Sequence, residues 1–128
     1  MRTFVISLFI LISMVGKAQL NDYYWVKLDS LNIKQTDKKW TGWTSVDLMS
    51  CFELNRNRFV IYSPKKIQKF TFLTIVSEVV KNEPFPRFSI RATDDDGVIC
   101  EVYLWTGQDK RLYVKIKYLN GEYKYMGK

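Results

Sequence analysis

The chain has 128 residues, of which 20 are basic and 13 acidic, so its net charge is +7; it contains two cysteines and no histidine. The absence of histidine excludes Ser-His-Asp and Cys-His nucleophile activation, and it excludes nearly every catalytic zinc site, because these depend on imidazole. No glycine-rich phosphate-binding loop is present. The composition therefore predicts a protein that is not an enzyme and holds no cofactor or metal.

The first 18 residues have the layout of a secretory signal peptide. Arg2 gives a positive start, the apolar run Phe4–Val15 follows, and Gly16 and Ala18 place small residues before a cut after Ala18. The run of 12 residues is shorter than the roughly 20 that a membrane-spanning helix needs. We therefore expect a cleaved signal peptide, no transmembrane anchor, and a mature protein that is periplasmic or secreted in a bacterium.

Residues 19–39 are polar and weakly patterned. Trp25, Leu28 and Leu31 have helical spacing behind a capping residue at Asp22, which predicts a short helix. An extended N-terminal arm fits the same residues, and both alternatives stay open.

Residues 40–128 predict a β-domain, because short β-rich or alternating runs are separated by turn residues throughout. Turns are expected at 55–57, at Asp94–Gly97 and at Asn120-Gly121. The expected strands are 47–54, 58–62, 69–80, 88–92, 98–105, 111–119 and 123–126. The fold class is therefore all-β, a single small antiparallel barrel or sandwich of about seven strands joined by hairpins.

The final hairpin predicts a basic outer face. A two-residue turn at Asn120-Gly121 sets Lys117 opposite Lys124 and places Lys115 beside them, while the apolar residues of both strands face inward. Such a face is either a solvated surface or a binding surface for an anionic partner, such as a lipid headgroup or an acidic glycan.

The two cysteines, Cys51 and Cys100, invite a disulfide in an exported protein. Strand alternation argues against it, because Cys100 falls on the apolar face of its strand and Cys51 on the opposite face of its own. A β-bulge would reverse this parity, so both alternatives stay open.

Four aromatic residues are candidate ligand-binding groups. Tyr103 and Trp105 alternate away from the apolar face of their strand, and Trp40 and Trp43 stand just before the first expected strand of the β-domain. Exposed rings of this kind stack on sugars or grip a lipid. The alternative is that they cover one end of the core.

The catalytic arrangement that the composition leaves open is a carboxylate pair, as in glycosidases. The candidates are Asp47, Glu53, Glu78 and Glu101. Asp47, Glu53 and Glu101 fall at outward, solvated strand positions, which is more typical of surface charges than of catalytic acids.

The second half of the chain combines an alternating strand, an Asp-rich turn, a strand with Cys and Val, and a Tyr-rich hairpin. The residues are Ala92, Asp94, Gly97, Cys100, Val102 and Leu104, followed by Leu112–Tyr118. This pattern resembles uncharacterised small exported β-proteins of Gram-negative bacteria, and the resemblance implies a compact β-domain with no known active site. By analogy alone the chain is also similar to lipocalins, although Trp40-Thr41-Gly42-Trp43 lacks their Gly-x-Trp spacing.

Together these features predict an exported, non-enzymatic binding module. Its expected partner is a small apolar ligand, an envelope component or another protein, and not nucleic acid. The alternative is a small secreted inhibitor or accessory protein that acts through loops such as Glu83–Pro86. A carboxylate glycosidase is the third hypothesis.

Overall fold

The computed structural model describes residues 18–20, 23–35, 38–78 and 87–127. The predicted signal peptide, apart from Ala18, and the predicted loop Glu83–Pro86 lie outside the described residues. Among the described residues, no helix is long and apolar enough to cross a membrane.

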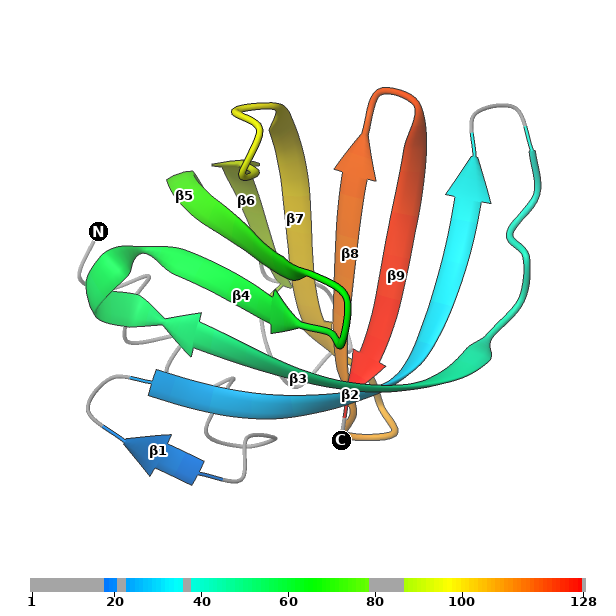
Figure 1. The fold of residues 1–128 in the computed structure, drawn as a ribbon, viewed down its shortest axis with the longest axis horizontal. Helices are drawn as coiled ribbons and strands as arrows, with labels where there is room; N and C mark the ends of the chain where they lie inside the picture. The colour runs from blue at the N-terminus through cyan, green and yellow to red at the C-terminus, as the bar shows by residue number, and fades with distance from the viewer. Residues whose placement is uncertain (1–17, 21–22, 36–37, 79–86, 128) are drawn as a thin grey trace.

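The described residues form an all-β domain (Figure 1). Its elements are β1 (Ala18–Leu20), β2 (Tyr23–Gln35), β3 (Thr44–Glu53), the 3-10 helix η1 (Leu54–Arg56), β4 (Arg58–Tyr62), β5 (Ile67–Glu78), β6 (Arg87–Thr93), β7 (Ile99–Thr106), β8 (Leu112–Tyr118) and β9 (Gly121–Gly127). Each strand pairs antiparallel with the next, and β2 also pairs with β9, so that β2–β9 close into an eight-stranded barrel. The barrel expected from the sequence is confirmed, with one strand more than expected.

The additional barrel strand is β2, where the sequence predicted an arm or a short helix. A β-bulge explains the misleading pattern, because the register shifts between Leu28 and Ser30 against both β3 and β9. Against β9 the extra residue is Asp29, whereas against β3 the extra residue lies on β3. The bulge lets Leu28 and Leu31 both pack on the core although they are three positions apart. The prediction of a short helix was therefore wrong, and the β-domain begins before residue 40.

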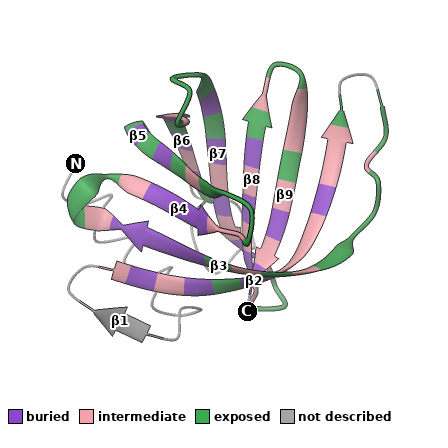
Figure 2. Ribbon diagram, in the orientation of Figure 1, coloured by how far each residue is buried: buried purple, intermediate pink, exposed green. Residues whose placement is uncertain are grey.

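The barrel interior is filled by apolar side chains that alternate with exposed ones along the strands (Figure 2). Phe52 and Phe59 lie on paired strands with ring centroids 4.4 Å apart, and Phe70 follows at 6.4 Å from Phe59. Together with the buried Phe88 they belong to the apolar core of the barrel. Burial of each of these rings contributes roughly 1.5–3 kcal/mol.

The final hairpin turns one residue earlier than the Asn-Gly pattern predicts. Lys117 pairs with Glu122, and Lys115 pairs with Lys124, so the predicted opposition of Lys117 and Lys124 was wrong. The reason lies on β2, because a Cβ on Gly121 would stand 3.0 Å from the carbonyl oxygen of Lys34. Gly121 is thus needed for the close approach of β9 to β2 and does not form the turn. The predicted inward and outward faces are unchanged, since the shift keeps the same parity.

The two cysteines are free thiols and both are buried. Cys100 belongs to the barrel core, whereas Cys51 alternates with the core residue Phe52 and therefore points outward. Burial is the largest cause that raises the pKa of each thiol to about 11. The disulfide hypothesis is not supported by the structure, and the strand alternation that argued against it is correct.

Candidate functional site

Rings and ammonium groups form a row across the outer face of β7, β8 and β9. Lys115 places its Nζ 4.8 Å from the ring centroid of Tyr103, and Lys124 places its Nζ 4.6 Å from that of Trp40. The two lysines are cross-strand partners. The row therefore runs from a ring through two neighbouring cations to a second ring.

A second row lies beside the first, one pair of residues further along the strands. The guanidinium of Arg87 lies 5.8 Å from the ring centroid of Trp105. Trp105 stacks on its cross-strand partner Tyr113, with centroids 5.4 Å apart and planes at 7°. Trp43 meets Tyr113 edge-on at 6.4 Å. The structure thus brings all four predicted aromatic residues to one face of the barrel.

Hydrogen bonds to β2 hold the segment that carries the two early tryptophans. The backbone N–H of Thr41 donates to the carbonyl of Ile33 at 2.8 Å, and that of Gly42 donates to the Oδ1 of Asn32 at 2.9 Å. Gly42 has a φ of +96°, a conformation that side chains rarely adopt. This fixed turn places Trp40 above Lys124.

A groove of about 380 Å³ lies among these residues. It is lined by Arg87, Phe88, Ser89, Tyr103, Trp105, Lys115 and Lys124, and we call it the lysine groove. Among the residues that the structure describes, its lining contains three cations and no carboxylate. Burial and then the charge of Lys115 lower the pKa of Lys124, against the opposing effect of Glu122. An anion bound in the groove would raise the pKa of Lys124 again, because a nearby negative charge favours the protonated ammonium group.

One acidic neighbour of the groove, Glu122, is shared between two lysines. Its carboxylate lies 3.6 Å from the Nζ of Lys115 and 3.8 Å from that of Lys34. Two ammonium groups therefore share one carboxylate, and the charge of Glu122 also acts on Lys124. The net charge of these three lysines and Glu122 is positive, which favours the binding of an anion.

Lys117 stands apart from the other two predicted lysines. Its cross-strand partners are Glu101 on β7 and Glu122 on β9, so it lies in a line of alternating charges. It does not line the lysine groove. The predicted basic trio is thus a pair, Lys115 and Lys124, and a separate residue whose cross-strand partners are acidic.

The aromatic rings of the two rows already contact other side chains of the protein. Cations lie over Trp105, Tyr103 and Trp40, and Trp105 also stacks on Tyr113. Tyr103 further donates a hydrogen bond to Glu101, which, ahead of burial, raises the pKa of Tyr103 to about 12. The arrangement favours recognition by fixed cations over the stacking of a sugar on an open ring.

The carboxylates that the sequence offered as catalytic candidates lie in separate contacts. Glu53 accepts hydrogen bonds from Nε and Nη2 of Arg58, at 2.5 and 3.2 Å, and is buried. The expectation that Glu53 is solvated was therefore wrong. Asp47 is exposed beside Lys27, and the side chain of Glu78 lies outside the described residues. Among the described residues, no three metal-ligating side chains cluster.

Two members of the site were missed by sequence reasoning, Tyr113 and Arg87. Tyr113 could have been found, because it alternates with the buried Leu112 and Val114 and pairs with Trp105. Strand alternation could not have indicated Arg87, because Arg87 is the first residue of β6 and follows residues 79–86, which lie outside the described part of the chain. Comparison with protein-family models, with curated proteins and with solved structures finds no match to this chain.

Proposed function

We propose that the protein is an exported, non-enzymatic binding module and that its lysine groove binds an anionic group of an envelope component. The observation that carries the proposal is the pairing of Lys115 with Lys124 in a groove whose described lining residues include no carboxylate. Arg87, whose guanidinium lies over Trp105, adds a third cation to the described lining of the same groove. Phosphate and carboxylate groups are the anions that such side chains hold.

The aromatic residues give the cations fixed positions. Each ammonium group lies against a ring, so little side-chain freedom remains to be lost when a ligand binds. A hydrogen bond to a charged group contributes roughly 1.5–3 kcal/mol, which is about a tenfold to hundredfold change in affinity. Loss of both lysines therefore removes most of the specific binding.

Calorimetric titration tests the proposal with three probes: inorganic phosphate, phosphatidylcholine vesicles containing phosphatidylglycerol, and oligogalacturonate. They represent a free phosphate, a lipid headgroup and an acidic glycan. We expect at least one probe to bind to the wild type, and the double variant K115Q/K124Q to weaken that binding by about tenfold or more. Vesicles of pure phosphatidylcholine should not bind.

The control is K69Q/K117Q, which removes the same charge at two exposed lysines outside the groove. We expect it to lower affinity by less than about threefold, through long-range electrostatics alone. An equal loss in both double variants would show that binding follows net charge and would contradict the proposal. The absence of binding to all three probes would contradict it as well.

Export is tested separately by expression in a Gram-negative host. Cleavage after Ala18 predicts that the periplasmic or secreted protein begins at Gln19. N-terminal sequencing of the fractionated protein checks this, and an uncleaved cytoplasmic product would contradict it.

A further inference from the structure

The interior of the barrel opens into a pocket at the end opposite η1. We call it the mouth pocket, and its volume is about 370 Å³. Its lining combines the core residues Phe70, Ile116 and Tyr125 with a rim of Lys66, Gln68, Val98, Tyr118, Asn120 and Tyr123. This volume lies within the range of small-molecule sites, roughly 300–1,000 Å³.

The charge at the rim is nearly balanced. Among the described residues of the lining, Lys66 is the one that carries a charge, and Asp94 stands close to it. Burial alone would raise the pKa of Asp94, but three hydrogen bonds and the charge of Lys66 lower it. Because Asp94 stays ionised beside Lys66, the pocket offers little net charge to a ligand. An uncharged molecule therefore enters at the lowest desolvation cost.

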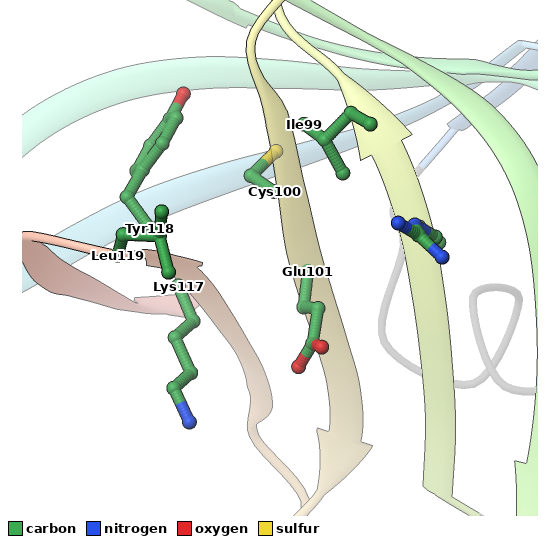
Figure 3. Close-up of a pocket in the computed structure, with 7 residues that line it drawn as sticks. Ile99, Cys100, Glu101, Lys117, Tyr118 and Leu119 are labelled. Carbon is green, nitrogen blue, oxygen red and sulfur yellow. The ribbon is translucent and has the colours of Figure 1, made fainter.

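Tyr118 forms the side wall of the mouth pocket. The pairing of β7 with β8 stops at Glu101 and Lys117, and an outer cleft of about 500 Å³ follows between the two strands. Tyr118 lines both the cleft and the pocket. Figure 3 shows Lys117 and Tyr118 leaving β8 in opposite directions, with Cys100 and Glu101 on the neighbouring strand.

Contacts of the Tyr118 side chain with Asp94, Tyr123 and Cys100 hold this wall in place. The hydroxyl of Tyr118 donates to Oδ2 of Asp94 at 2.9 Å. The ring of Tyr118 meets that of Tyr123 edge-on, with centroids 6.4 Å apart and planes at 87°. The hydrogen bond joins β8 to the turn after β6 across the place where pairing has ended. Its loss would free the ring to move between the pocket and the cleft.

We propose that the mouth pocket binds a small uncharged apolar molecule with one hydrogen-bonding group, and that Tyr118 closes the pocket on the side of the outer cleft. The apolar part rests on Phe70, Ile116 and Tyr125. The amide groups of Gln68 and Asn120 at the rim supply donors and acceptors for the polar group. The site is separate from the lysine groove, with which it shares no lining residue.

The test uses phenylnaphthylamine, a neutral dye whose fluorescence rises in an apolar site. We expect saturable binding to the wild type and about tenfold weaker binding to Val98→Trp, whose indole fills the mouth. The matched control is Val76→Trp, because both valines are exposed and Val76 lies outside the pocket. Circular dichroism confirms that each variant is folded.

Several outcomes would overturn the proposal. These are the absence of saturable binding, equal binding by the two folded tryptophan variants, and tighter binding of the anionic dye anilinonaphthalene sulfonate. K115Q/K124Q should bind the neutral dye as the wild type does, which separates this site from the lysine groove. Tyr118→Phe should release the dye several times faster in stopped-flow measurements, and an unchanged rate would show that Tyr118 does not close the pocket.

Discussion

The guanidinium of Arg111, in the loop between β7 and β8, pairs with the carboxylate of Asp29, the bulge residue of β2. The same guanidinium donates from Nε to the carbonyl of Gly127 at 3.2 Å, and Ser30 donates its hydroxyl to Asp29 at 3.0 Å. One side chain thereby connects β2, the end of β9 and the loop after β7. These contacts stabilise the seam, which is the junction of β2 and β9 at which the barrel closes.

Replacement of Asp29 by alanine should lower the free energy of unfolding by about 1–2 kcal/mol, since the charged hydrogen bond of Arg111 is lost at a partly buried site. Urea unfolding measures the change. The control is Asp47→Ala, whose exposed ion pair with Lys27 should contribute no more than about 0.5 kcal/mol. Equal effects of the two substitutions would show that the seam contact adds no stability.

Replacement of Gly121 by alanine should destabilise the protein by about 1–3 kcal/mol, because the new methyl group meets the carbonyl oxygen of Lys34. Gly97→Ala is the comparison, since its Cβ would meet open space and only its φ of +77° resists the change. We expect the smaller loss there, about 1 kcal/mol. If Gly121→Ala were neutral in urea unfolding, the close contact of β9 with β2 would be contradicted.

The lowered pKa of Asp94 predicts that the folded protein loses stability in acid. Its pKa in the folded state lies below the ordinary 3.8, so the folded state binds this proton less tightly than the unfolded state does. The contribution of Asp94 is then fully present above about pH 5 and is lost as the pH falls through 4 toward the folded value. Asp94→Asn should therefore show a smaller drop in Tm between about pH 6 and pH 3 than the wild type. An identical drop would contradict the prediction.

The cysteines should be unreactive in the folded protein. Both are buried, and burial raises the pKa of Cys51 and Cys100 to about 11, so little thiolate is present near neutral pH. Dithionitrobenzoate should react with two thiols per chain only after unfolding. Non-reduced peptide mapping should find no bond between the two residues, and a crosslinked peptide would show that the strand parity is wrong.

The strands from Thr44 onward could be predicted because each keeps one face apolar, and β4 has the predicted bounds, Arg58–Tyr62. Strand β2 could not, because the bulge at Asp29 changes a spacing of two into one of three, which is also the spacing of a helix. Such a bulge can be identified only once the pairing with the neighbouring strands is known. The local pattern therefore did not predict the first strand of the barrel wall, β2.

The outer face was predicted better than its contacts. Alternation placed Tyr103, Trp105, Lys115 and Lys124 on the outside, but not the neighbours that they meet. The Asn-Gly pattern set the wrong register, since Gly121 serves a contact with Lys34, a residue far away in the sequence. A one-residue change in the turn replaced the pair Lys117–Lys124 by Lys115–Lys124. The preference of Asn-Gly for a two-residue turn is local, so it could not indicate the contact of Gly121 with β2.

The pairing of β2 with β9 has a consequence for the order of folding. Leu28 pairs with Gly127, nearly the whole described chain away, so closure of the ring costs more loop entropy than any hairpin within it. The successive hairpins can form early from neighbouring segments, whereas the ring completes only after the last strand is available. Until then β2 and β8 present open edges to other chains, and the interval before closure is when this protein is most exposed to aggregation.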